Sequence, residues 1–161
     1  MSFEEEVGAL PPVGFWDPLG LSKDADAEKF NAYRTAELKH GRVAMLAVTG
    51  YIVAENYRFP GAIDLDGTTF QSIPNGLAAF GAVPAFGWFQ IAASVGFWEI
   101  FGWKQASEDV GDFGFLDAST AKKFDGNPAA RFEQRTKEIQ NGRLAMLAIA
   151  GTMFFLFPFV F

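Results

Sequence analysis

The sequence contains no cysteine, so disulfide scaffolds, zinc–thiolate clusters, iron–sulfur centres and thiol catalysis are all excluded. Its single histidine, His40, also excludes a histidine-based catalytic triad and any metal site built from several histidines. Basic residues are scarce, 13 against 19 acidic ones, and a net charge of −6 is unsuited to a nucleic-acid-binding protein. No nucleophile stands with a matching base, so the sequence does not predict an enzyme.

Apolar and aromatic residues are abundant instead. Hydrophobic residues make up 50% of the chain and aromatic residues 16%, with 19 phenylalanines, and the mean hydropathy is +0.11. These values exclude an intrinsically disordered chain, and they argue against an ordinary water-soluble domain. The length of 161 residues predicts a single domain, 1–161. The acidic start, 1–8, is no secretory signal, so we expect a processed form if the protein is targeted to an organelle.

Three uncharged runs suggest membrane spans, which need about 20 apolar residues each. They cover residues 43–54, 67–98 and 144–161. Charged segments without internal proline precede the first and third runs and extend each into one long helix, the third starting at Pro128 after a possible Asn127 cap. The sequence therefore predicts three transmembrane helices, at about 27–55, 84–103 and 128–157.

The basic residues indicate how these helices are oriented. Of the 13 lysines and arginines, only Arg58 lies in the loop between the first and second spans. The others flank or begin the spans on the side shared by the N-terminus and the 104–130 loop. Because basic residues stay on the cytoplasm-like side of a membrane, we expect a multi-pass protein with its N-terminus on that side.

An internal repeat relates the first and third helices. Residues 34–50 align without gaps on residues 135–151, with ten identities in 17 positions at an offset of 101. Upstream, Gly14-Phe15-Trp16-Asp17 matches Gly114-Phe115-Leu116-Asp117 at an offset of 100. The repeat predicts an all-α membrane protein in which the first and third helices form a crossed pair with pseudo-two-fold symmetry, with the middle helix separate.

The repeat carries charges in an unusual place. Glu37 and Arg42 are five positions apart, as are Glu138 and Arg143, and five positions turn a helix by about 140° net. The two charges of one helix therefore cannot pair well, and crossed pairing is expected, Glu37 with Arg143 and Glu138 with Arg42. Small residues recur every third position from 41 to 50 and from 142 to 151, which lets two helices approach closely. The simpler alternative is a set of surface charges on soluble amphipathic helices.

A carboxylate neutralised by arginine can still be an axial ligand to a hard metal. His40 and Asn141, three residues beyond the two glutamates, can each donate one lone pair. Such isolated donors fit metals that arrive already held, as magnesium is in a chlorin ring. Gln90 and Glu99 are further candidates on the middle helix. The alternatives are ordinary polar roles: a satisfied histidine, a glutamine facing neighbouring helices and an acid at the membrane interface.

These motifs resemble a known family. E-x-x-H-G-R-x-A-M-L-A at 37–47 and E-x-x-N-G-R-L-A-M-L-A at 138–148 look like the two helix motifs of the light-harvesting chlorophyll-binding superfamily, and 15–21 resembles its segment before the first helix. Further segments resemble the fucoxanthin– or peridinin–chlorophyll a/c branch, namely Arg58-Phe59-Pro60-Gly61, Ile73-Pro74-Asn75-Gly76 and Gly87-Trp88-Phe89-Gln90-Ile91.

The resemblance implies a set of pigment contacts. Chlorophyll magnesium would be held by Glu37, His40, Gln90, Glu99, Glu138 and Asn141, with Arg42 and Arg143 compensating the glutamate charges. Two carotenoids would end near Trp16 and Asp17 and near Phe115 and Asp117. The pigments would be chlorophyll a, chlorophyll c and a carotenoid of the fucoxanthin, peridinin or diadinoxanthin type.

The resemblance also implies a place and a function. The protein would be a plastid product of the thylakoid membrane, with its N-terminus in the stroma, in contact with thylakoid lipids, neighbouring antenna proteins and the core of photosystem I or II. It would harvest light and pass excitation to a photosystem. The alternatives are photoprotective quenching on the same scaffold and, in a different class, a small membrane transporter that uses intramembrane glutamate and arginine.

Two departures from the family pattern affect the expected sites. Some members carry a glutamine or histidine about 14 residues after the position of Asn141, where this chain has Phe155. The second G-F-x-D segment also lacks the Pro-Leu-Gly that follows Asp17. The chain therefore departs from the family pattern at one chlorophyll ligand and at one carotenoid end.

Overall fold

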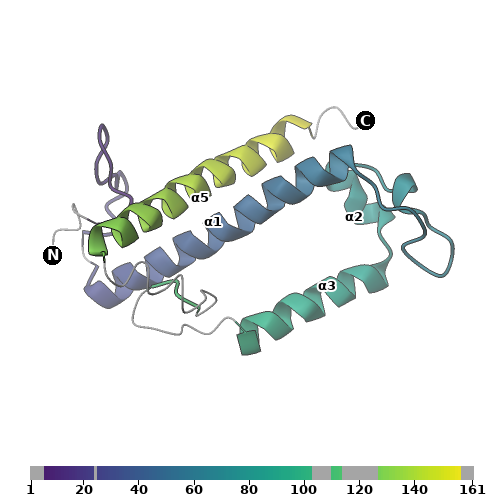
Figure 1. Cartoon of the computed structure of the whole chain (residues 1–161), viewed down its shortest axis with the longest axis horizontal. Coiled ribbons are helices and arrows are strands. Elements are labelled where there is room, and N and C mark those ends of the chain that lie inside the picture. Colours follow the sequence, from purple (N-terminus) through teal and green to yellow (C-terminus); the bar gives the residue numbers. More distant parts are fainter. Residues whose placement is uncertain (1–5, 24, 103–109, 114–126, 157–161) are drawn as a thin grey trace. The chain divides into compact units, whose positions relative to one another are not determined.

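The computed structural model describes residues 6–23, 25–102, 110–113 and 127–156, except the side chains of Phe155 and Leu156. The described part is helical, and its only β-type pairings are two isolated bridges, Leu10–Gly14 and Ala62–Thr69. Along the chain the elements are α1 (Ala27–Asn56), η1 (Phe70–Ser72), η2 (Gly76–Ala78), α2 (Ala79–Ala82), α3 (Ala85–Phe97), η3 (Trp98–Gly102) and α5 (Pro128–Leu156), as Figure 1 shows.

The two long helices begin at side-chain caps. At the start of α1, the Asp26 carboxylate accepts a hydrogen bond of 2.9 Å from the Lys29 backbone N–H. At the start of α5, the Asn127 side chain accepts from the Ala130 N–H at 3.2 Å, and Pro128 occupies the first helical position. Such caps satisfy N–H groups that have no partner within the helix. The cap expected at Asn127 is therefore confirmed.

The chain divides into two compact units, and both long helices run from one into the other. The first unit is Met1–Val43 with Gln105–Met146, and the second is Ala44–Lys104 with Leu147–Phe161. The first unit thus contains the N-terminal parts of α1 and α5. The second contains their C-terminal parts together with α2, α3 and η3.

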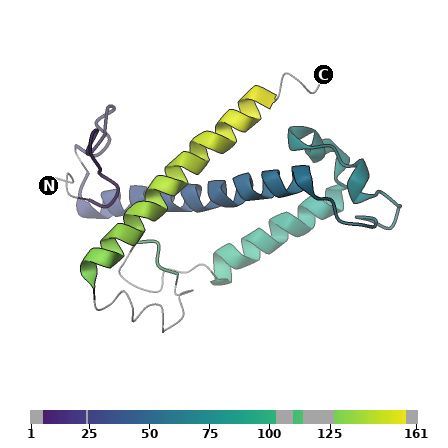
Figure 2. The same cartoon turned by 45° about the horizontal axis from the view of Figure 1, so that its top comes forward.

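In the first unit α1 and α5 cross, as Figure 2 shows. A Cβ atom built on Gly41 would lie 3.0 Å from the Cα of Gly142, and the reverse distance is also 3.0 Å. The two backbones are therefore in direct contact, which only small residues permit. Leu38 and Ile139, which are repeat partners, are buried beside this crossing, 8% and 4% exposed. The crossed helix pair expected from the repeat is confirmed.

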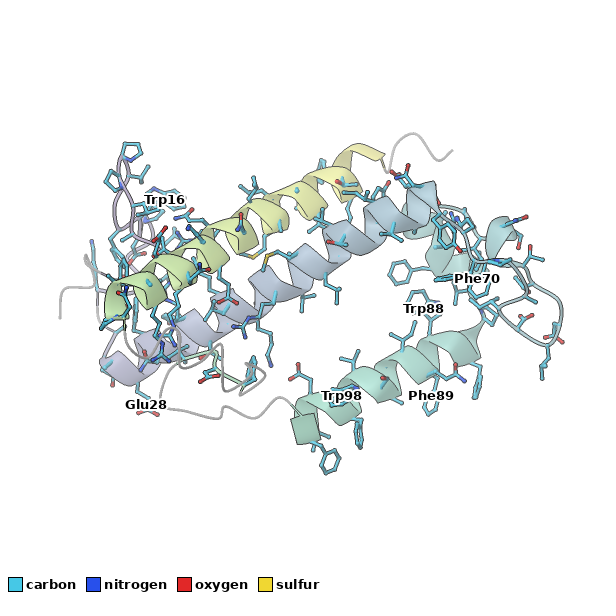
Figure 3. The ribbon with its side chains drawn as sticks, in the orientation of Figure 1. Trp16, Glu28, Phe70, Trp88, Phe89 and Trp98 are labelled. Atoms are coloured by element: carbon cyan, nitrogen blue, oxygen red, sulfur yellow. The ribbon has the colours of Figure 1, made fainter. Side chains whose placement is uncertain are left out.

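The second unit contains a sharp turn before α3. The rings of Phe80 in α2 and Trp88 in α3 are stacked with centroids 4.6 Å apart, and the Trp88 indole N–H donates to the Phe80 carbonyl at 3.2 Å. Figure 3 shows Trp88 pointing from α3 towards α2, whereas Phe89 points the opposite way. At the far end of α3 the helix widens into the π-helical turn η3, where the Trp98 ring covers Gly102 so closely that a Cβ there would lie 2.4 Å away.

A membrane-spanning helix has to be both long and apolar enough to cross the bilayer. Within the described residues, no single helix satisfies both requirements, and the segments Gly76–Ala82 and Ala85–Gly102 satisfy them only as a pair bent by 110°. Large apolar side chains of α3 and η3 are nonetheless exposed, with Phe86 69%, Phe89 67% and Phe101 67% exposed.

Candidate functional site

Two ion pairs join the crossed helices. The Arg42 Nε donates to Glu138 Oε1 at 2.6 Å, and the Arg143 Nε donates to Glu37 Oε1 at 2.7 Å. The four side chains are between 28% and 40% exposed. The crossed pairing expected from the 140° offset is therefore confirmed, and each helix contributes one acid and one base to the site.

The surroundings of the two carboxylates differ. Glu37 has a second cation, because Arg34 Nη1 donates to its other oxygen, Oε2, at 2.6 Å. Arg34 in turn lies over the Phe30 ring, 5.4 Å from its centroid. Within the described part of the chain Glu138 pairs with Arg42 alone. Arg34 is not among the residues predicted from the sequence, although its i,i+3 spacing from Glu37 is a known signal for a helical ion pair.

Two loop carbonyls accept hydrogen bonds from the arginines of the ion pairs. Arg42 Nη1 donates to the Gly111 carbonyl at 2.8 Å, and Arg143 Nη1 donates to the Gly8 carbonyl at 2.9 Å. These two contacts are also not among those predicted from the sequence. A signal was present, since Glu-Glu-Val-Gly at 5–8 and Glu-Asp-Val-Gly at 108–111 are a second duplicated motif, at an offset of 103.

His40 is arranged as a one-atom donor. Its Nδ1 lies 2.7 Å from the Ala36 carbonyl oxygen. A carbonyl can only accept, so Nδ1 carries the proton and Nε2 keeps its lone pair. The imidazole is exposed, as is Asn141 at the equivalent position in α5. Next to them the repeat-related Val43 and Leu144 are 58% and 67% exposed, which provides apolar surface beside each donor.

The middle-helix candidates lie in the second unit. Gln90 is exposed on α3, and Glu99 is half-buried in the π-helical turn η3. Within the described residues, no group of three or more acidic or histidine side chains could hold a metal ion.

The carotenoid-end candidates are described only in part. Asp17 organises its own loop, since its carboxylate accepts hydrogen bonds from the Leu21 and Ser22 backbone N–H groups, at 3.0 and 2.9 Å, and from the Ser22 hydroxyl. These bonds, the Ser22 hydroxyl first, lower the pKa of Asp17 below its ordinary value. The neighbouring Trp16, labelled in Figure 3, is 74% exposed. Phe115, Asp117 and the side chain of Phe155 lie outside the described residues.

Comparison with known proteins gives a consistent result. The family described as chlorophyll A-B binding protein matches residues 3–155. Fucoxanthin-chlorophyll a-c binding protein E, chloroplastic, of Phaeodactylum tricornutum is 47% identical over 158 residues, covering 95% of this chain and 79% of the relative. The protein of the same name from Macrocystis pyrifera is 42% identical over 156 residues, covering 95% and 74%. With this coverage, the chain belongs to the chlorophyll a-b binding protein family.

Proposed function

We propose that this protein is a light-harvesting antenna that binds chlorophyll a, chlorophyll c and a fucoxanthin-type carotenoid and passes excitation energy to a photosystem. The observation that carries the proposal is the pair of crossed glutamate–arginine contacts at the helix crossing, each beside a single exposed donor on the same helix. Family membership and the names of the relatives, which bind fucoxanthin and chlorophylls a and c, support it.

The donors fit the magnesium of a chlorophyll. An ionised carboxylate has about four lone-pair sites. Arg143 and Arg34 together use two of those on Glu37, and Arg42 uses one on Glu138. A lone pair therefore stays available on each carboxylate, with its charge compensated. His40 offers Nε2, and Asn141 offers its amide oxygen. When bound, the chlorophylls supply the light absorption and energy transfer, whereas the protein fixes their positions.

Further pigments are assigned to the second unit and to the N-terminal loop. Gln90 and Glu99 are proposed as single-donor ligands on α3 and η3, where exposed phenylalanines provide apolar surface for a macrocycle. Exposed Trp16 is proposed to contact a carotenoid end, while Asp17 keeps the shape of that loop. The corresponding proposal for the second carotenoid end names Phe115 and Asp117, from the sequence repeat alone.

A thylakoid location explains the exposed apolar side chains. We propose three membrane spans, formed by the apolar parts of α1, α3 with η3, and α5, surrounded by thylakoid lipids and pigments. The distribution of lysine and arginine supports a stromal N-terminus. Neighbouring antenna proteins and a photosystem core, of I or II, are the proposed partners that receive the excitation energy.

The alternative functions are less well supported. A transporter that uses intramembrane charges needs groups that change partners, whereas these glutamates are paired with arginines held by loops. Photoprotective quenching uses the same pigments, so it differs in the fate of the excitation. The acids on the proposed luminal side, such as Asp64, are few; Asp64 itself already accepts two hydrogen bonds from Thr68, both at 3.0 Å. This weakly favours harvesting over pH-dependent quenching.

The direct test is refolding of the purified chain with a mixture of chlorophyll a, chlorophyll c and fucoxanthin. The expected product is a coloured protein whose chlorophyll a emission has excitation bands from chlorophyll c and the carotenoid. Its chlorophyll a fluorescence lifetime should stay long at neutral and acidic pH. A colourless protein would overturn the proposal, and a lifetime that shortens strongly on acidification would favour quenching.

A further inference from the structure

The duplicated valine–glycine turns form a structural unit with the ion pairs. Gly8 and Gly111 are both buried, and both have positive φ, +91° and +82°. Each directs its carbonyl to the Nη1 of one arginine, Gly8 to Arg143 and Gly111 to Arg42. Both turns lie in the first compact unit, as do both ion pairs.

The two turns occupy equivalent positions in the pseudo-symmetric pair. A Cβ on Gly8 would lie 3.0 Å from Ile139 Cγ2, and one on Gly111 would lie 2.7 Å from Leu38 Cδ1. Leu38 and Ile139 are repeat partners, as are Arg42 and Arg143. The pseudo-two-fold relation therefore includes the loops as well as the helices, and each turn packs on one helix through the same two kinds of contact.

Glycine is favoured at both positions for two independent reasons. A positive φ is strained for any residue with a Cβ. A Cβ would also require a buried side chain at the crossing to shift, Ile139 beside Gly8 and Leu38 beside Gly111. Gly14, in the same N-terminal loop, separates the two reasons, because its φ is +65° but nothing lies within 4 Å of a Cβ there. It is the matched control for strain without contact.

The Gly8 and Gly111 carbonyls fix the orientation of each guanidinium group relative to its glutamate. A guanidinium group donates in a fixed, planar fork. Nη1 donates to the loop carbonyl and Nε donates to the carboxylate, so two hydrogen bonds fix the guanidinium plane. Arg42 is also covered by the Phe113 ring, 5.2 Å from the guanidinium carbon. Without the carbonyl, the arginine could rotate. Glu138 would then lose its fixed orientation, whereas Glu37 would keep only its bond from Arg34.

We propose that Gly8 and Gly111 are positioning residues for two separate pigment sites. The Val7–Gly8 turn acts through Arg143 on the chlorophyll site at Glu37, and the Val110–Gly111 turn acts through Arg42 on the site at Glu138. The inference rests on the proposed function, in which Glu37 and Glu138 each hold a chlorophyll magnesium. Groups that orient a metal ligand in this way typically change affinity by about 10- to 100-fold when removed.

The test compares pigment loss site by site. Wild-type protein, Gly8→Ala, Gly111→Ala and Gly14→Ala are refolded with the pigment mixture, and the chlorophyll bound per polypeptide is measured. Glu37→Ala and Glu138→Ala provide the reference. Subtracting the absorption spectrum of each variant from that of the wild type gives the band of the pigment bound at that glutamate. A chain that starts at Ala9 lacks the Gly8 carbonyl and adds no backbone strain. If Gly8→Ala does not refold, this shortened chain tests the role of the carbonyl in its place.

The expected outcome is crossed selectivity. Gly111→Ala should lose most of the Glu138 band. Gly8→Ala and the shortened chain should weaken the Glu37 band alone, and by less, because Arg34 also holds Glu37, and Gly14→Ala should retain both bands. Retention of the full Glu37 band in Gly8→Ala and the shortened chain, or equal loss of both bands, would overturn the inference and leave the proposed function standing. If Glu37→Ala and Glu138→Ala themselves lose no chlorophyll, the ligand assignment fails and the inference fails with it.

Discussion

Gly41 of α1 and Gly142 of α5 touch backbone to backbone, each 3.0 Å from where a methyl group on the other would lie. This contact brings the helices close enough for Arg42 to reach Glu138 and for Arg143 to reach Glu37. The ion pairs and the candidate ligands therefore depend on glycine, which has no side chain, at both 41 and 142.

The first prediction concerns this contact. Gly41→Ala should destabilise the protein by about 1–3 kcal/mol, because the neighbouring atom is backbone and cannot move aside. Gly50→Ala, on the same helix with nothing within 4 Å of its Cβ, should be neutral or stabilising by up to about 1 kcal/mol from helix propensity. Thermal unfolding of the pigmented proteins, followed by visible circular dichroism, measures both. Equal stability of the two variants would exclude a tight crossing.

The second prediction concerns His40. His40→Leu should lose one chlorophyll and keep the fold, because the imidazole is exposed and its only described hydrogen bond is with Ala36 of its own helix. His40→Asn, which reproduces the donor present at Asn141, should retain most of that chlorophyll. Pigment stoichiometry after refolding distinguishes the variants. A full chlorophyll complement in His40→Leu would mean that His40 is not a ligand.

A third prediction follows from the different surroundings of the two glutamates. Arg143→Leu should be milder than Arg42→Leu, because Glu37 keeps Arg34 as a counter-charge whereas Glu138 has only Arg42 among the described residues. An acid left without its partner in a partly exposed site costs about 1–3 kcal/mol. The comparison is the yield of pigmented protein after refolding. The double variant Arg34→Leu/Arg143→Leu should give as low a yield as Arg42→Leu. A lower yield from Arg143→Leu alone than from Arg42→Leu would contradict the prediction.

The fourth prediction concerns pH. Hydrogen bonds from Ser22 lower the pKa of Asp17 in the folded loop, so the ionised carboxylate stabilises the fold. That contribution is complete at neutral pH and is lost as the pH falls below about 4, through the folded pKa. Ser22→Ala should move the pKa of Asp17 back towards its ordinary value. A titration of carboxyl-labelled aspartate by NMR in detergent measures the shift, and an unchanged titration in Ser22→Ala would contradict it.

The helices and their crossing could be predicted from the sequence, because both depend on regular geometry. The 3.6-residue period places Glu37 and Arg42 about 140° apart, and the repeat supplies the second helix that pairs with each. Spacing and duplication are therefore sufficient to predict the pairs Arg42–Glu138 and Arg143–Glu37, which the structure contains.

The loop contributions could not be predicted in the same way. The Gly8 and Gly111 carbonyls reach the arginines because of positive φ angles, and backbone conformation in loops has no sequence period. Their Val-Gly motif recurs at an offset of 103 rather than 101, so a gap-free alignment of the helices does not include it. Asp17 is a similar case, since its hydrogen bonds with Ser22 depend on the shape of a turn.

The central claim is that each crossed pair works as one unit that holds a pigment, and the Arg42–Glu138 double-mutant cycle tests it most directly. Arg42→Leu leaves the Glu138 carboxylate without its cation, whereas Glu138→Gln keeps an oxygen donor and removes the charge. Chlorophyll bound per polypeptide and unfolding free energy are measured for the wild type, both single variants and the double variant. The account predicts that the double variant recovers part of what Arg42→Leu loses, with a coupling of about 0.5–3 kcal/mol. If the double variant is as poor as the sum of the two single variants, Arg42 and Glu138 act independently and the account is wrong.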